Sequence, residues 1–170
     1  MRCKLKKDSC LKGGAMNMIK DKPVMINLLA TARYDQAPDF PVQFMTRGSL
    51  SMLPNGEAVI RYTESFHDDD SGETMTAIVS LEMAKSRVTM TRHGDVTNTM
   101  VFVPQQRYEG IYQTPYGDMN MGVFARDVSC RIGPEKGSVH LKYQLDFQGS
   151  YASTNELHLE YSAEQKGKTQ

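Results

Sequence analysis

The stretch VQFMTRGSLSMLPNGEAVIRYTESFHDDDSGETMTAIVSL, residues 42–81, contains three apolar runs separated by two turn signals. Within each run apolar side chains recur at every second position, as at Ala58, Ile60 and Tyr62. A period of two is typical of strands that bury one face. The turn signals are Pro54-Asn55-Gly56 and Asp70-Ser71-Gly72. The stretch therefore predicts three antiparallel strands joined by short turns.

The same alternation continues on both sides of this stretch, from Val24 to Tyr161, with further turn signals between the runs. No comparable length has helical spacing, and at most one helical turn is expected, at residues 82–86. Strands with one apolar face each would leave two unprotected edges in an open sheet, whereas a closed sheet has none. We therefore predict an all-β fold, a closed antiparallel meander barrel of about 8–10 strands.

Charge is distributed unevenly along the 170 residues. Residues 1–23 carry seven Lys and Arg side chains against two Asp, whereas residues 24–160 carry 11 basic and 17 acidic side chains. We expect a basic flexible N-terminal extension over residues 1–23, a single barrel domain over 24–162 and a flexible tail over 163–170. Because a net negative body repels phosphate backbones, nucleic-acid binding by the barrel is not expected.

Three cysteines, Cys3, Cys10 and Cys130, are too few for a disulfide framework. Residues 1–23 contain no apolar run of seven residues, and the apolar runs elsewhere are far shorter than the roughly 20 residues that span a bilayer. The sequence therefore predicts a cytoplasmic protein without a membrane partner. It contains no motif for a cofactor, a phosphate loop or a nucleophilic serine.

Pairing across the turns predicts which inward side chains are neighbours. Pairing Leu53 with Glu57 puts Gly48 opposite Tyr62, a familiar cross-strand fit of glycine and aromatic ring. Further predicted opposite pairs are Thr46–Glu64, Phe66–Glu73, Tyr62–Ala77, Phe102–Tyr108, Asn98–Tyr112 and, across a two-residue turn at Tyr116-Gly117, Thr114–Met119 and Tyr112–Met121. The turn at His93 is ambiguous by one residue, so the direction of Arg92 stays open.

Chain direction alternates in a meander, so chain position also predicts the end of the barrel at which a side chain lies. Polar inward residues gather at the end opposite Pro54-Asn55-Gly56, and apolar residues fill the other end. Polar residues at one end only are typical of a barrel whose other end, the floor, is packed with apolar side chains and whose polar end, the mouth, is open to solvent. The candidate ligand-binding residues at this mouth are Thr46, Tyr62, Glu64, Arg92, Asn98, Tyr112, Thr114 and Tyr116.

Several motifs carry a family resemblance. They are Tyr62-Thr63-Glu64-Ser65, Arg92-His93-Gly94-Asp95, Met100-Val101-Phe102, Tyr112-Gln113-Thr114-Pro115-Tyr116-Gly117-Asp118 and Tyr143-Gln144-Leu145. From about Met25 to Tyr161 the chain resembles the YwiB-like family of bacterial proteins of unknown function. The resemblance implies a calycin-like, lipocalin-type β-barrel in the cytoplasm, and it implies no activity.

Glu64 and Arg92 form the most informative charged pair. An inward carboxylate is costly unless a cation or hydrogen-bond donors meet it, and Arg92 is the nearest candidate. One interpretation is a structural salt bridge at the mouth. Another is a binding cluster in which Arg92 holds an anionic group and Glu64 orients it. In a catalytic version, Glu64 would act as a base beside Tyr112.

The remaining motifs have structural interpretations. The element Tyr112–Gly117 is typical of a turn with packed tyrosines, and a ligand-lining role for Tyr112 or Tyr116 is the alternative. His67–Asp70 lacks the spacing of a calcium loop and indicates a solvated acidic turn. His140 and His158 are expected on the outward side of adjacent strands, well apart from each other. No metal site is therefore predicted.

Three functional hypotheses follow. The leading one is a barrel that binds a small amphipathic or anionic ligand at the mouth. The second is an accessory protein that binds a partner through its outer face or through the loops at residues 35–41 and 148–154. The third is an enzyme that uses Glu64 as general base.

Overall fold

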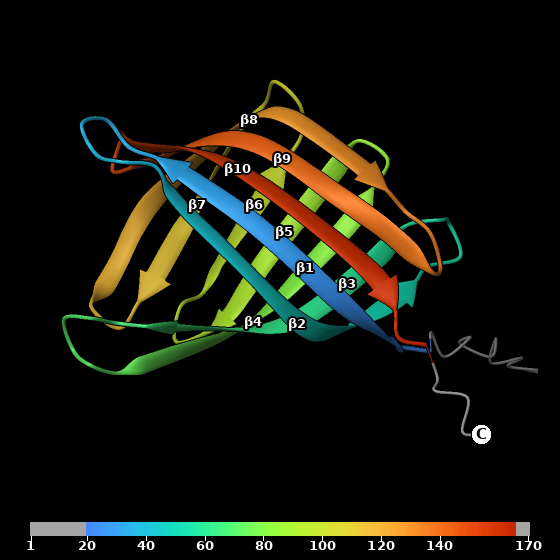
Figure 1. Cartoon of the computed structure of the whole chain (residues 1–170). Helices are drawn as coiled ribbons and strands as arrows, with labels where there is room; N and C mark the ends of the chain where they lie inside the picture. The colour runs from blue at the N-terminus through green and yellow to red at the C-terminus, as the bar shows by residue number, and fades with distance from the viewer. Residues whose placement is uncertain (1–19, 166–170) are drawn as a thin grey trace, which may run out of the picture.

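The computed structural model describes residues 20–165, and these form ten antiparallel strands (Figure 1). The strands are β1 (Lys22–Arg33), β2 (Phe40–Met52), β3 (Ala58–His67), β4 (Thr74–Ala84), β5 (Arg87–Gly94), β6 (Asn98–Phe102), β7 (Arg107–Thr114), β8 (Gly117–Arg131), β9 (Lys136–Phe147) and β10 (Ser150–Ala163). The predicted all-β meander is confirmed. The single helical turn that the sequence allowed at residues 82–86 does not form, because β4 extends to Ala84 and pairs with β5 up to Arg87.

The predicted domain limits can be compared with the described residues only in part. Lys22 and Pro23, which we assigned to the basic extension, belong to β1, and Ala163, which we assigned to the tail, ends β10. The rest of the extension up to residue 19 and the tail from residue 166 lie outside the described residues.

The sheet closes by pairing its first strand with its last. β1 pairs with β10 from Val24–Ala163 to Arg33–Thr154, so the strand order runs continuously from β6 through β1 and β10 to β7. The remaining seam, between β6 and β7, is joined by one bridge. In this bridge the Thr97 and Gln113 backbones exchange two hydrogen bonds of 3.0 and 2.9 Å.

Inward side chains fill most of the barrel, because every second residue of each strand faces the axis. The largest fully buried side chains are Phe102, Ile26, Leu50, Ile60, Leu81, Met83, Met90, Leu141, Leu159, Val24, Val79 and Val88. The predicted floor is therefore packed, and burial of this apolar surface is the main source of stability.

Two predicted registers are wrong by two residues. Phe66 pairs with Met75 rather than Glu73, because the Asp68 carboxylate accepts hydrogen bonds from the Asp70 N–H and the Ser71 hydroxyl and so shifts the turn along the chain. Tyr62 accordingly pairs with Val79 rather than Ala77.

The second error lies at the β7–β8 turn. Thr114 pairs with Gly117 rather than Met119, and Tyr112 with Met119 rather than Met121. The Thr114 hydroxyl donates to the Gly117 carbonyl and accepts from the Tyr116 N–H, which closes a shorter turn. A shift of two residues leaves every side chain on its predicted face.

The wall of the barrel opens between β2 and β3. Their ladder runs only from Met52–Ala58 to Gly48–Tyr62, as predicted for Gly48, and stops there. Beyond this point β2 pairs only with β1, and β3 pairs only with β4. The predicted Thr46–Glu64 pair therefore does not form.

Gly48 stands at the last pair before the opening, where a side chain would not fit. A Cβ atom there would lie 2.5 Å from the Arg61 carbonyl oxygen and 2.6 Å from Ile26 Cδ1. We expect Gly48→Ala to lower the free energy of unfolding by about 1–3 kcal/mol through overpacking, measured by urea denaturation. Ser49→Ala on the opposite face of β2 is the control, and an equal loss in both variants would contradict this account.

Candidate functional site

A hollow of about 410 Å³ lies at the opening between β2 and β3. Its walls come from β2, β3, β5, β6, β7 and β9 and from the β5–β6 turn, which meet because the barrel closes. The lining residues are Val42, Phe44, Glu64, Ser65, Phe66, Arg92, Val96, Met100, Tyr112, Tyr143 and Leu145. The hollow is thus mainly apolar with a small polar group, as binding pockets commonly are.

Glu64 and Arg92 form an ion pair in the wall of this hollow. Arg92 Nε donates to Glu64 Oε2 at 2.8 Å, Nη2 approaches Oε1 at 3.5 Å, and each side chain is 20% exposed. The pair spans β4 at the position of the small Ala77, which lies between Glu64 and Gly94. Burial alone would lower the pKa of Arg92, but the Glu64 carboxylate outweighs it and raises that pKa.

Three tyrosines surround the pair. Burial raises the pKa of Tyr62, Tyr112 and Tyr143, and the negative charge of Glu64 acts in the same direction in each case. Their hydroxyl groups therefore stay protonated and can donate hydrogen bonds. The Tyr62 hydroxyl and the Asn98 Oδ1 atom are buried without a hydrogen-bond partner among the described residues.

The structure brings together part of the predicted set. Glu64, Arg92 and Tyr112 line the hollow, and Tyr62 and Asn98 are buried next to it, each on a strand that carries one of the lining residues. The ambiguous turn at His93 left the direction of the Arg92 side chain open, and the structure shows that it points inward.

The other three predicted residues lie outside the hollow. Thr46 pairs with the inward Ile26 on β1 but does not line the hollow, and Thr114 is engaged in the β7–β8 turn. Tyr116 is 75% exposed, and its hydroxyl donates to Asp68 Oδ2 at 2.9 Å, so it joins two turns instead.

Sequence reasoning missed the apolar lining and Tyr143. The alternation placed Tyr143, Phe44 and Leu145 on the inward face, which was a usable signal. What it lacked was the position of β9 across the barrel from β3 and β5, which depends on closure.

A family model described as a domain of unknown function, DUF1934, matches residues 26–159. The chain belongs to this family. Among solved structures, the YwiB protein from Bacillus subtilis is similar over 85% of this chain and 94% of that one, with a TM-score of 0.70 and 16% identity. A protein of unknown function from Bacteroides ovatus has a TM-score of 0.32 at 13% identity, over 85% and 45% of the two chains. No curated protein matches the chain.

These findings confirm the resemblance to the YwiB-like family and the barrel fold. The DUF1934 description assigns no activity, and 16% identity supports the fold alone. Within residues 20–165 this family member has no helix long and apolar enough to span a membrane.

The predicted separation of His140 and His158 is wrong. They are directly opposite on β9 and β10, in the part of the ladder that follows a register shift of one residue between Tyr151 and Ser153. Within the described residues 20–165 there is no group of three or more His, Cys, Asp or Glu side chains arranged to hold a metal ion.

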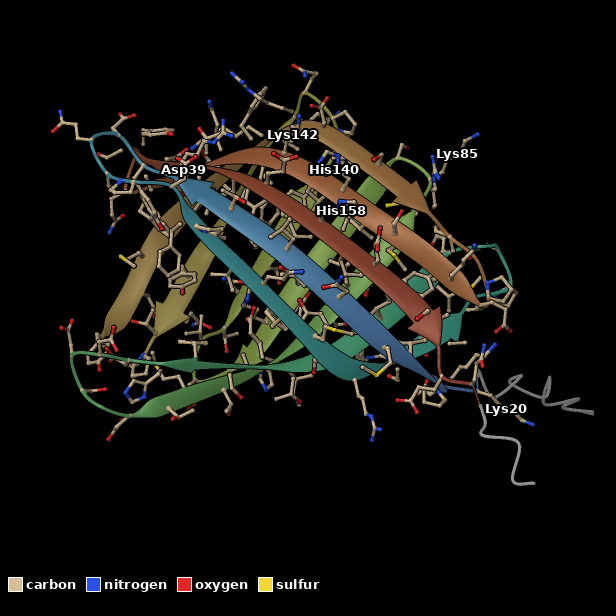
Figure 2. All side chains as sticks on the ribbon, viewed as in Figure 1. Lys20, Asp39, Lys85, His140, Lys142 and His158 are labelled. Carbon is tan, nitrogen blue, oxygen red and sulfur yellow. The ribbon has the colours of Figure 1, made fainter. Side chains whose placement is uncertain are left out.

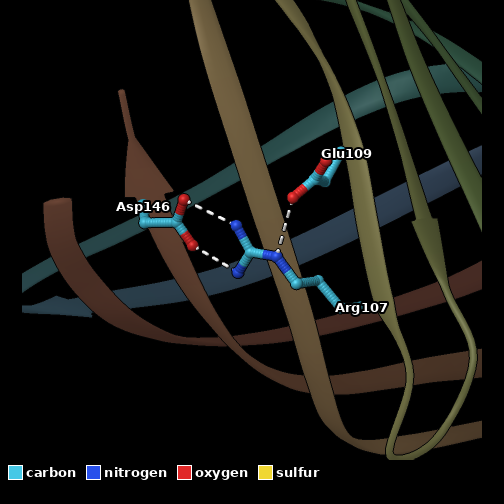
Figure 3. A network of polar contacts seen from close by, with 3 residues as sticks. All are labelled: Arg107, Glu109 and Asp146. Carbon is cyan, nitrogen blue, oxygen red and sulfur yellow. Dashed lines mark hydrogen bonds and ion pairs between the residues drawn. The ribbon is translucent and has the colours of Figure 1, made fainter. Parts of the chain in front are cut away.

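A second charged cluster lies on the outer face of this DUF1934 barrel (Figure 3). Arg107 Nη1 and Nη2 donate to the two Asp146 oxygens at 2.6 and 2.9 Å, and Nε donates to Glu109 at 3.2 Å. Arg107 reaches Asp146 over Gly122, where a Cβ atom would lie 2.1 Å from Nη2. The cluster links β7 to β9 across β8 and is separate from the hollow.

A double-mutant cycle on Glu64 and Arg92 measures their interaction. Because each is 20% exposed, Glu64→Gln or Arg92→Met should cost about 1–3 kcal/mol, less than the ~3–5 kcal/mol of a fully buried broken pair. The double variant should cost clearly less than the sum of the single variants, as measured by chemical denaturation. Additive losses would show that the two charges do not stabilise each other.

The Asp146 pair predicts a pH dependence. Hydrogen bonds from Arg107 lower the pKa of Asp146 in the folded chain below its unfolded value of about 3.9. Its contribution to stability is therefore complete above pH ~4 and is lost as the pH falls through the folded pKa. Urea midpoints should be higher for the unmodified chain than for Asp146→Asn at pH 7, and the difference should shrink as the pH falls through the folded pKa of Asp146. Asp118→Asn, which removes an exposed carboxylate on β8, is the control and should leave the urea midpoint at pH 7 unchanged.

Proposed function

We propose that this protein binds a small amphipathic ligand in the hollow between β2 and β3. The observation that carries the proposal is the Glu64–Arg92 pair, which lies in the wall of a partly open, otherwise apolar hollow rather than in the packed floor. A charged pair that served only packing would be replaceable by apolar side chains at little cost, as buried ion pairs often are.

The polar end of the hollow is rich in donors. Among residues 20–165, Glu64 is the only carboxylate that lines it, and both of its oxygens already face Arg92. Arg92 has five N–H donors, of which two are directed at Glu64. The protonated hydroxyls of Tyr112 and Tyr143 add further donors. This arrangement favours a ligand whose polar group accepts hydrogen bonds, a carboxylate above all.

The apolar end of the hollow determines which kind of tail the ligand can carry. Phe44 from β2 and Phe66 from β3 flank the opening, and Val96, Met100 and Leu145 line the interior. A volume of about 410 Å³ falls within the ~300–1,000 Å³ of typical small-molecule pockets. A short acyl chain with one acidic end group matches both the size and the polarity.

The test compares octanoate with octanol, which share a chain and differ in the polar group. We expect octanoate to bind the full-length protein more tightly in isothermal titration calorimetry. Arg92→Met should weaken octanoate binding by about tenfold or more, the loss of one charge-assisted contact. Leu145→Phe, which narrows the hollow without changing charge, should weaken both compounds.

Arg107→Met is the matched control, because Arg107 is also paired with a carboxylate but lies on the outer face. It should leave octanoate binding unchanged. Equal affinity of the unmodified chain, Arg92→Met and Leu145→Phe for octanoate would contradict the proposal, as would the absence of binding to both compounds together with no copurifying small molecule in native mass spectrometry.

One observation favours the accessory-protein alternative. Tyr34, Phe40 and Tyr151 are 47, 62 and 45% exposed at the β1–β2 and β9–β10 connections, the loops expected to bind a partner. The alternative with Glu64 as general base has less support, because a base needs a free acceptor oxygen and Arg92 faces both oxygens of Glu64. A cytoplasmic location and the lack of nucleic-acid binding stay predictions.

A further inference from the structure

His140 and His158 form a cross-strand pair on the outer face of the barrel (Figure 2). Their strand neighbours Val139, Leu141, Leu157 and Leu159 point into the core, so the two imidazoles point outward. The side chains are 34 and 48% exposed. The ring centres are 5.7 Å apart and the ring planes are inclined by 57°. Two adjacent imidazoles are therefore accessible from solvent.

Each ring has its own carboxylate. His140 Nε2 lies 2.7 Å from Glu156 Oε1, and His158 Nε2 lies 3.4 Å from Glu160 Oε1. Histidines that bind metals commonly donate their other ring N–H to a carboxylate, which fixes the tautomer and the orientation of the ring. His140 Nε2 is hydrogen-bonded to Glu156, which leaves its Nδ1 atom to offer to a ligand. His158 lies within ion-pair distance of Glu160 without a hydrogen bond to it, so its ring keeps a nitrogen for the same ligand.

The spacing of the rings suits one shared metal ion. Two imidazoles bound to a single ion through bonds of about 2.0–2.1 Å have ring centres roughly 5–6 Å apart. The observed 5.7 Å lies in this range before any movement of the side chains. Both histidines are also on paired strands of a closed sheet, so little backbone freedom has to be lost on binding.

We propose that His140 and His158 bind one late first-row divalent transition-metal ion, Zn²⁺, Ni²⁺ or Cu²⁺, on the outer face of the barrel. Imidazole nitrogens select these ions over Mg²⁺ and Ca²⁺, which prefer oxygen ligands. Water completes the coordination, since the protein supplies two ligands. Glu156 and Glu160 orient the rings and offset the charge of the ion.

The residues that flank the two histidines add no competing charge. On the flanking strands Leu29 is opposite His158 and Ser129 is opposite His140, and neither side chain carries a charge. Lys142 is opposite Glu156 on the same face and is the nearest cation in the ladder. The Irving–Williams order then predicts the tightest binding for Cu²⁺.

The experiment titrates the full-length chain, without an affinity tag, with Zn²⁺ and Cu²⁺ in isothermal titration calorimetry. Thiolates bind the same ions. The parent chain and all histidine and glutamate variants therefore carry Cys3→Ser and Cys10→Ser. We expect one site per chain, tighter for Cu²⁺. His140→Asn and His158→Asn should each weaken binding by at least about tenfold, and Glu156→Gln should weaken it less.

His67→Asn and His93→Asn are the matched controls, because both are exposed histidines on other strands. They should leave the affinity unchanged. Added Zn²⁺ should also raise the Tm of the parent chain, and this shift should disappear in His140→Asn, since an ion that binds only the folded pair stabilises it. The proposal would be overturned if metal binding survived in His140→Asn and in His158→Asn, or if it fell equally in the His67→Asn and His93→Asn controls.

Discussion

The ladder between β2 and β3 ends at Gly48–Tyr62, and the candidate site depends on that ending. If the two strands stayed paired, Thr46 and Phe44 would cover Glu64 and Phe66, and the charged pair would be sealed in the core. Full burial of an ion pair often costs more in lost hydration than the attraction between the charges returns. Because the strands part, Glu64 and Arg92 keep one fifth of their surface exposed, and the hollow has an entrance.

Closure of the barrel is the second requirement. Glu64, Arg92, Tyr112 and Tyr143 come from β3, β5, β7 and β9, and no two of these strands are neighbours in the sheet. They face one another only because β1 pairs with β10 and because the Thr97–Gln113 bridge holds the seam. The packed floor built on Phe102, Ile60 and Leu141 provides the stability that allows the other end to remain hollow.

The sequence predicted which face of the sheet a side chain lies on better than it predicted which residues are opposite each other on neighbouring strands. The alternation was sufficient to place Tyr62 and Tyr112 inward, and it remained correct where the registers at Phe66 and Thr114 were wrong by two residues. Prediction failed where a bulge intervened. The irregularity between Tyr151 and Ser153 shifts the β9–β10 register by one residue, and His158 lies opposite His140 in the part of the ladder that follows it. Nothing in the composition of that hairpin marks the extra residue, and the departure of β2 from β3 at Gly48 was equally unmarked.

The two proposed sites share β9 but lie on its opposite faces. Tyr143 faces the hollow and His140 faces solvent, since they are three positions apart along an extended strand. A metal ion held by His140 and His158 therefore cannot contact a ligand beside Arg92. Any influence between them has to pass through the position of β9 itself, and a ladder paired on both sides, with β8 and with β10, resists such movement. The inner and outer sites are therefore independent, and loss of either leaves the other in place.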